Sequence, residues 1–254
     1  MMRMLQHIKL LKNKYTRWYI ADYKKFIKLT GDNSDFVISN NYPCTKDKFL
    51  SSGISSGHYF HQDLYVAHEI FNAKPIKHID IGSRIDGFVA HLAVFREVEV
   101  FDIRPLDNSI KNVTFRRVDF MKETTIFENY CDSVSCLHTI EHFGLGRYGD
   151  EIDPKGHLKG FSAICRLLKP KGTFYFSVPM GPNRIEFNAH RIFGLEYLIQ
   201  WVQNEFDIQK FAYIDDNGLF HENITLNDSL IQSNCNCNHG CAIFVLKKKQ
   251  TTNC

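Results

Sequence analysis

The chain has 254 residues, of which 44% are hydrophobic and 13% aromatic, enough to bury a large core in one α/β domain with terminal additions. Its 31 Lys and Arg against 28 Asp and Glu leave a net charge of +3, too small and scattered a surplus to indicate a nucleic-acid partner. No apolar run approaches about 18 residues and no secretory signal opens the sequence, so we expect neither a transmembrane segment nor export, and predict a cytoplasmic protein.

The first predicted element is a basic amphipathic helix within residues 1–30, which carry eight Lys or Arg. Apolar residues recur with helical spacing at Leu5, Ile8, Leu11, Tyr15 and Trp18. We expect this stripe to pack on the main domain or on a second copy in a homodimer; contact with a membrane surface is the weaker alternative. The predicted division is a helix and connector, residues 1–50, followed by a main domain, residues 51–250.

After a polar, turn-rich connector the sequence predicts a second helix, residues 59–71. Its apolar stripe would consist of Phe60, Leu64, Ala67 and Phe71. Strands and helices then alternate. The predicted strands are residues 75–81, 98–103, 113–120, 132–140, 172–179, 207–214 and 241–248, and a turn, KPKG, precedes the fifth. The predicted helices among them are residues 85–95, 122–128, 158–168 and 195–206.

This alternation predicts a mostly parallel sheet with helices on both faces. Such sheets bind ligands beyond the carboxyl ends of their strands, near the point where the strand order reverses. The residues that end each strand are therefore the first candidates for a functional site.

Three successive strand ends favour an adenosine-containing cofactor. The first runs into DIGSRIDG, where Gly82 lets the backbone approach a ligand, but the next glycine is Gly87, so the GxGxxG turn that binds a pyrophosphate is absent. The second ends at Asp102, whose carboxylate can accept both hydroxyl protons of a ribose. The third ends at Asp119 and Phe120, which can receive an adenine amino group and cover its ring. Each acid alone could be a surface or capping residue.

The fourth strand leads into HTIEHFGLGRYGD, residues 138–150, which holds three glycines, two histidines, Glu141 and Arg147. Ordering several glycines costs conformational entropy, which favours an active-site loop over a plain connection. The alternative is a mobile excursion between a strand and a helix.

The succession of DIG, Asp102, VDF, DSVSCLHTIEH and LLKPKGTFYFSVP resembles the class I S-adenosylmethionine-dependent methyltransferase family over about residues 59–248. More narrowly, HYFHQDL, DIGSRIDGF and EHFGLGRYGD resemble a related domain family of unassigned function. The resemblance implies a Rossmann-like sheet of order 3-2-1-4-5-7-6 with its last strand antiparallel, S-adenosyl-L-methionine as the cofactor, and methyl transfer. The sequence departs from the family at Ser83 and Arg84, where a small residue and a second glycine are expected.

Carried over residue by residue, the resemblance implies that Gly82 lies against the methionine part of the cofactor, Asp102 on its ribose, and His138 beside it at the end of the fourth strand. The whole implied cofactor site is Asp80, Gly82, Ser83, Asp102, Asp119, Phe120 and His138.

If the methyl acceptor is a hydroxyl, a base of near-neutral pKa should remove its proton, and histidine is the natural candidate. We predict His142 as this base, with His190 as the second choice and Glu141 as a further catalytic candidate; either histidine could equally be structural. A less favoured hypothesis has His138, Glu141 and His142 bind a divalent metal that lowers the pKa of the acceptor. We predict no metal.

The expected acceptor is a small hydroxylated molecule, with a saccharide suggested by family context alone. One alternative is a nicotinamide-dependent reductase or epimerase, but the YxxxK pair of the short-chain enzymes occurs only at Tyr42 and Lys46, before the first strand. Another is a binding protein that keeps the fold without chemistry.

The eight cysteines are expected to be free thiols in a chain of this size without an export signal. A structural zinc site in NCNCNHGC is the minor alternative, because the cysteines there are spaced CxCx3C instead of in paired CxxC motifs. Its ligands would be Cys235, Cys237, His239 and Cys241.

Overall fold

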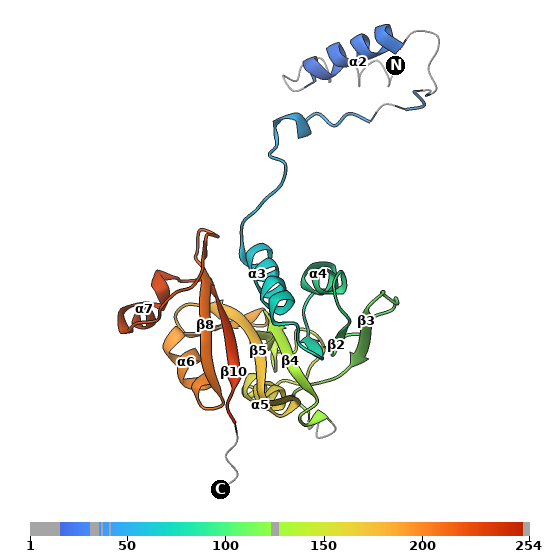
Figure 1. Cartoon of the computed structure of the whole chain (residues 1–254). Helices are drawn as coiled ribbons and strands as arrows, with labels where there is room; N and C mark the ends of the chain where they lie inside the picture. The colour runs from blue at the N-terminus through green and yellow to red at the C-terminus, as the bar shows by residue number, and fades with distance from the viewer. Residues whose placement is uncertain (1–15, 31–35, 37, 41, 123–126, 251–254) are drawn as a thin grey trace. The chain divides into compact units, whose positions relative to one another are not determined.

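The computed structural model describes residues 16–30, 36, 38–40, 42–122 and 127–250. The chain forms two compact units, Met1–Ile54 and Ser55–Cys254, and each is considered by itself (Figure 1). The described part of the first unit contains a helix, α2 (Arg17–Thr30), and a short 3-10 turn, η1 (Asp47–Phe49). These two elements contact each other, because the Lys48 ammonium in η1 lies 4.4 Å from the centre of the Trp18 ring in α2. The other predicted apolar positions of the N-terminal helix, Leu5, Ile8, Leu11 and Tyr15, lie outside the described residues.

The second unit is built on an eight-stranded sheet of order β3-β2-β1-β4-β5-β10-β8-β9. Neighbours from β3 to β5 are parallel, whereas β10 is antiparallel to both β5 and β8. The strands are β1 (His78–Ile81), β2 (Val98–Asp102), β3 (Val113–Arg117), β4 (Cys131–Leu137), β5 (Leu168–Met180), β8 (Phe206–Ile214), β9 (Phe220–His221) and β10 (Gly240–Lys248). The seven predicted strands are β1 to β5, β8 and β10, so the predicted order is confirmed, and β9 adds a short edge strand.

Helices cover both faces of this sheet, as predicted (Figure 1). On one face α3 (His58–Ala73), the π-helical turn η2 (Ile85–Val89) and α4 (Ala90–Ala93) pack through Ile70, Phe88 and Leu92. On the other face α5 (Gly156–Leu167) and α6 (Leu195–Gln203) pack through residues such as Phe161 and Leu198. All four residues of β1 are buried, as expected for a parallel strand covered on both sides.

The remaining elements lie in the connections between strands of the sheet. The 3-10 turn η4 (Ile140–His142) follows β4, and β6 (Arg184–Glu186) pairs with β7 (His190–Ile192) in a separate hairpin. Before β10 lie α7 (Asp228–Gln232) and the 3-10 turn η5 (Asn234–Asn236). Asn227 caps α7, because its side-chain oxygen accepts a hydrogen bond of 3.0 Å from the Leu230 amide. Across the described residues, no helix is both long and apolar enough to cross a membrane.

The predicted apolar face of α3 is wrong. Phe60, Leu64 and Phe71 are exposed, and of the predicted stripe only Ala67 is buried. The helix instead buries a face that includes Gln62 and Asp63, because hydrogen bonds satisfy these polar side chains: Ser177 donates to the Gln62 carbonyl, and Gln62 donates to Asp63. Because this face carries polar residues, hydrophobic periodicity does not indicate that it is buried.

Two other predictions differ from the structure, and one lies partly outside the described residues. The helix at 85–95 is a π-helical turn followed by one short helix, with non-helical φ and ψ at Gly87. The KPKG turn lies inside β5, where Lys171 has a φ of 63° and the register with β4 shifts. The predicted helix at 122–128 falls partly on residues 123–126, which are outside the described part of the chain.

Candidate functional site

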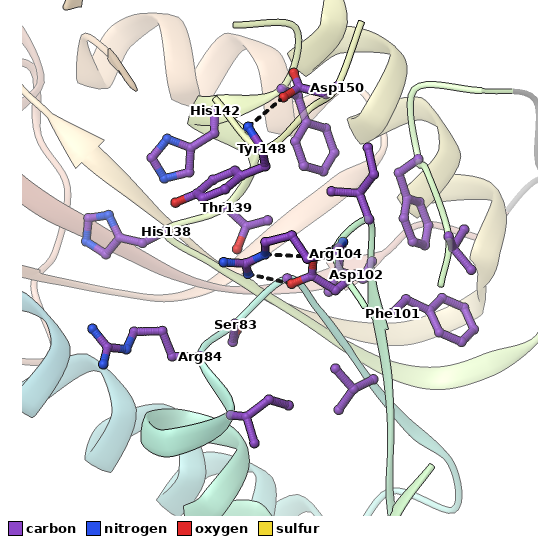
Figure 2. A pocket seen from close by; sticks show the side chains of 18 of the residues that line it. Ser83, Arg84, Phe101, Asp102, Arg104, His138, Thr139, His142, Tyr148 and Asp150 are labelled. Carbon is purple, nitrogen blue, oxygen red and sulfur yellow. Dashed lines mark hydrogen bonds and ion pairs between the residues drawn. The ribbon is translucent and has the colours of Figure 1, made fainter. Parts of the chain in front are cut away.

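A cavity of about 470 Å³ opens at the carboxyl ends of β1 to β4 (Figure 2). Its volume is within the range of roughly 300–1,000 Å³ that is typical of small-molecule sites. Six of the seven residues of the implied cofactor site line it because the strands that carry them are parallel and end at the same edge. They are Gly82, Ser83, Asp102, Asp119, Phe120 and His138.

The turn after β1 depends on Gly82, whose φ is +71°. Its amide donates a hydrogen bond of 2.9 Å to the Phe101 carbonyl on β2. A Cβ added at this position would overlap the Cγ2 methyl of Thr139. The glycine is therefore required by the left-handed backbone and by close packing on Thr139, in addition to any ligand that approaches it.

Asp80 is fully buried behind this turn and does not line the cavity. Its carboxylate accepts hydrogen bonds from the Ser83 amide at 3.1 Å, from the Ser83 hydroxyl at 2.8 Å and from the Ser135 hydroxyl at 2.6 Å. Burial raises the pKa of Asp80 to about 6, although the three hydrogen bonds oppose the shift. In this structure Asp80 supports Ser83 in the cavity wall and does not face a ligand itself.

Asp102 faces the cavity but is already paired with Arg104, as the dashed lines in Figure 2 mark. One oxygen, Oδ1, accepts from the Arg104 amide at 2.8 Å and from its Nε at 3.0 Å, and Oδ2 lies 2.5 Å from its Nη2. The guanidinium also lies 4.5 Å from the centre of the Tyr148 ring. Of roughly four acceptor sites on a carboxylate, three are taken, so Asp102 can accept one further hydroxyl while Arg104 stays in place.

Asp119 and Phe120 follow β3 by two and three residues and place a carboxylate beside a buried ring. Asp119 Oδ1 accepts a hydrogen bond of 3.0 Å from the Met121 amide, and its Oδ2 lies 3.8 Å from the Lys122 ammonium. The Phe120 ring is buried 5.9 Å from that of Phe101. Both Asp119 and Phe120 line the cavity, one with a polar and one with an apolar surface.

His142 also lines the cavity and is mostly buried. Its Nδ1 lies 2.7 Å from the Ala189 carbonyl, which can only accept, so Nδ1 carries the hydrogen and Nε2 has the free lone pair. Arg147 donates to the same carbonyl at 2.9 Å. Burial is the main influence that lowers the pKa of His142 below its usual value, so the imidazole is neutral at pH 7 and can accept a proton. Figure 2 places His138 and His142 on one side of the cavity.

Glu141 lies buried behind both histidines and does not line the cavity. Its Oε1 is 3.0 Å from His138 Nδ1 and 3.7 Å from His142 Nε2. Burial raises the pKa of Glu141 to about 7 and lowers that of His138 to about 3. Glu141 Oε2 and His138 Nε2 have no hydrogen-bond partner among the residues that the structure describes. The predicted trio therefore comprises a hydrogen-bonded pair, His138 and Glu141, with His142 beside it.

The second-choice base, His190, lies beside His142 but outside the cavity wall, with 6.5 Å between the two ring centres. Its Nε2 is 3.2 Å from a Glu186 carboxylate oxygen, and its ring stacks on His239 at 5.3 Å. The structure therefore brings His142, and not His190, to the cavity.

The glycine-rich loop after β4 is held by contacts that the sequence did not reveal. Arg191 is buried and donates to the carbonyls of Phe143 at 2.6 Å, Glu141 at 3.2 Å and Pro154 at 3.3 Å. At Gly144, where φ is +78°, a Cβ would overlap the Asp153 carbonyl. These contacts define one loop conformation and leave its histidines at the cavity.

Sequence reasoning missed Thr139, Arg104 and Tyr148 as wall residues. Arg104 stands two positions after Asp102 in the sequence, which is the signal that could have indicated their pairing. The seven cysteines described are free, as expected.

A family model described as Caenorhabditis protein of unknown function, DUF268, matches residues 97–249, more than half of the chain. No curated protein matches the sequence. Among solved structures, N-methyltransferase NodS from Bradyrhizobium japonicum WM9, in complex with S-adenosyl-L-homocysteine, is 10% identical with a TM-score of 0.51, and the match covers 84% of this chain and 94% of that one. The CurJ carbon methyltransferase is 12% identical with a TM-score of 0.50, over 74% of this chain and 54% of that one. At these identities the similarity shows a Rossmann-like methyltransferase fold.

Proposed function

Because the chain belongs to the DUF268 family of unknown function and has a methyltransferase fold, we propose that it is an S-adenosylmethionine-dependent methyltransferase. One observation carries the proposal: the ends of β1, β2, β3 and β4 contribute Gly82, Asp102, Asp119 and His138 to a single cavity of about 470 Å³. The S-adenosylhomocysteine bound by NodS, a protein of the same fold, supports the choice of cofactor.

The cavity residues fit an adenosyl group. Asp102 would receive the ribose, Asp119 and Phe120 the adenine, and the backbone at Gly82 and Ser83 the amino-acid end. The buried Phe120 ring offers an apolar surface, and Asp119 keeps acceptor capacity beyond its turn contact with Met121. The pairing of Asp102 with Arg104 competes with this fit. When bound, the cofactor supplies an electrophilic methyl group on a sulfonium.

The protein's own part in methyl transfer is to align an acceptor, keep water out and remove a proton. His142 is suited to the last task because its Nδ1–H donates to Ala189, which leaves Nε2 as a base. Arg147 donates to the same Ala189 carbonyl and so helps to hold it in the orientation that His142 contacts. Methyl transfer is mainly a matter of positioning, and the anchored loop that carries both residues provides it.

We propose O-methylation of a small hydroxylated acceptor, for which His142 is an appropriate base; a saccharide is one candidate on family context alone. Cytoplasmic location and homodimer formation stay predictions from the sequence. A nicotinamide-dependent reductase would also use an acid at the end of β2, and the Asp102 contact does not by itself distinguish the two cofactors.

Calorimetric titration of the full chain with S-adenosylmethionine, S-adenosylhomocysteine and NAD tests the proposal. We expect both S-adenosyl compounds to bind, and Asp102→Ala to weaken them about five-fold, equal to about 1 kcal/mol. The matched control is Asp107→Ala, which removes an exposed acid outside the cavity and should leave affinity unchanged. Binding of NAD alone would favour the reductase, and binding of none of the three would favour a protein that keeps the fold without the chemistry.

His142→Ala should leave S-adenosylhomocysteine affinity within two-fold and lower acceptor-dependent S-adenosylhomocysteine release by about 10²-fold or more, as for loss of a general base. A panel of small hydroxylated compounds serves as acceptors. His68→Ala, a change at an exposed histidine of α3, is the control. Unchanged turnover in His142→Ala would show that another group removes the proton.

A further inference from the structure

Three side chains from distant parts of the sequence converge beside the cavity. His58 is the first residue of α3, His138 follows β4, and Cys241 is the second residue of β10. One potential ligand atom from each, an imidazole nitrogen or the sulfur, lies within 4.8 Å of the other two. The rings of His58 and His138 are nearly parallel, with 5.3 Å between their centres. Two imidazoles and a thiol are the side chains that zinc prefers.

A second observation points to a ligand in this cluster. The His138 side chain is only 6% exposed, and its Nε2 has no hydrogen-bond partner among the described residues. Its other nitrogen, Nδ1, lies 3.0 Å from the Glu141 carboxylate. When Nδ1–H donates to that carboxylate, Nε2 carries a lone pair. A metal-binding histidine characteristically has this arrangement, with a carboxylate on one nitrogen and the metal on the other.

The surroundings of Cys241 also leave its sulfur available to a metal. The Cys241 sulfur is fully buried, and its nearest polar contacts are distant, at 3.7 Å from the Ala242 carbonyl and 3.8 Å from Gln62 Oε1. No short hydrogen bond would have to be broken at the sulfur for it to bind a metal.

We propose that His58, His138 and Cys241 bind one zinc ion, with Glu141 as the hydrogen-bond partner that orients His138. Zinc bonds of about 2.0–2.3 Å in a tetrahedral site place ligand atoms roughly 3.4–3.7 Å apart. The ligand atoms lie within 4.8 Å of one another, so they would have to approach by at most roughly 1.4 Å on binding. Cys241 releases its thiol proton to solvent as the Zn–S bond forms. Three protein ligands leave a fourth position open, as in catalytic zinc sites.

This site differs from the zinc motif suggested by the sequence. Of Cys235, Cys237, His239 and Cys241, only Cys241 belongs to the converging group in the described part of the chain. It also differs from the predicted trio of His138, Glu141 and His142, because Glu141 here contacts His138 and not the metal. His138 lines the cavity as well, so the ion would lie at its wall. Zinc binding does not depend on the proposed methyltransferase activity.

The test uses the full chain stripped with a chelator and titrated with Zn²⁺ or Co²⁺ alone. We expect one zinc per chain by elemental analysis after gel filtration. Cobalt should give the visible absorption of a tetrahedral site and a thiolate-to-cobalt charge-transfer band. His58→Asn and Cys241→Ser should each lower zinc affinity at least 100-fold. Cys241→Ser should remove the charge-transfer band, and His58→Asn should remove or weaken it. The matched controls are Cys237→Ser and His239→Asn, at the neighbouring positions of the CxCx3C motif, and both should bind as the unmodified protein does.

His58→Asn keeps the test decisive even if the buried Cys241→Ser variant does not fold, because His58 begins a helix and is only half-buried. Circular dichroism in the presence of chelator checks the fold of each variant. No zinc and no cobalt band in the unmodified protein would overturn the proposal. Full zinc binding by a folded His58→Asn would also overturn it, as would loss of zinc in Cys237→Ser with retention in Cys241→Ser.

Discussion

Arg104 should inhibit the binding of an adenosyl cofactor, so Arg104→Ala should tighten it. A ribose that places both hydroxyls on Asp102 needs two acceptor sites on the carboxylate. Arg104 occupies three of about four through its amide, Nε and Nη2, and its side chain alone accounts for two. The ribose must therefore displace at least one guanidinium contact, and the alanine variant removes that cost.

The magnitude follows from the exposure of the pair. The Arg104 side chain is 43% exposed and that of Asp102 11%, which makes this a partly screened ion pair worth about 1 kcal/mol. Its removal should lower the Kd for S-adenosylhomocysteine about five-fold. Higher salt should bring the Kd of the unmodified protein closer to that of Arg104→Ala, because salt weakens the ion pair in the unmodified protein.

Isothermal titration calorimetry of four proteins measures the effect: the unmodified chain, Arg104→Ala, Asp102→Ala and the double variant. If Arg104 acts through Asp102, its removal should have no effect in the Asp102→Ala background. Arg117→Ala is the control, because this exposed arginine donates to the Ile103 carbonyl and is not in the cavity wall. Weaker binding by Arg104→Ala would refute the reasoning and show that Arg104 helps to hold the cofactor.

Three further changes test the framework around the site. Gly82→Ala should lower the free energy of unfolding in urea by about 3 kcal/mol, because of the positive φ and the overlap with Thr139. Thr139→Ser in the same chain should restore part of this free energy. No recovery would mean that the backbone alone is responsible. Arg191→Met should cost about 3 kcal/mol and speed amide exchange in residues 141–154, because three buried carbonyls lose their donor; unchanged exchange there would contradict the anchoring role. Burial holds the pKa of His78 well below its usual 6.5, so the unfolded chain takes up a proton that the native state does not. The contribution of His78 to stability is therefore full above about pH 6.5 and is lost as the pH falls below it, at about 1.4 kcal/mol per pH unit. His78→Asn should reduce the acid slope of the unfolding free energy by that amount, and an equal slope in His78→Asn and in the unmodified protein would rule the mechanism out.

The strand ends show how far local sequence could predict the site. Asp102 and Asp119 were placed at a common edge because alternating strands and helices give a parallel sheet, whose carboxyl ends coincide. The same logic brought Gly82 and His138 into the cavity wall. It failed for Asp80, one residue from the end of β1, because side chains alternate between the faces of a strand and Asp80 is buried in hydrogen bonds to Ser83 and Ser135.

The buried face of α3 could not be predicted from hydrophobic periodicity. Gln62 and Asp63 occupy that face because Ser177, 115 residues further along the chain, supplies a hydrogen bond. A periodicity analysis assigns polar residues to solvent and so selects the opposite stripe, Phe60 and Leu64. Burial of a polar side chain depends on its partner, and that partner is known only after the chain has folded.

The sequence by itself determined the order of strands and helices and the residues at each strand end, because hydrophobic periodicity and turn residues act over a few positions. Only the tertiary structure decided which of those residues meet other parts of the chain. The contact of the Arg104 guanidinium with the Tyr148 ring is one such result, and the convergence of His58, His138 and Cys241 is another. These contacts depend on how separate elements pack together in three dimensions, which no local pattern specifies.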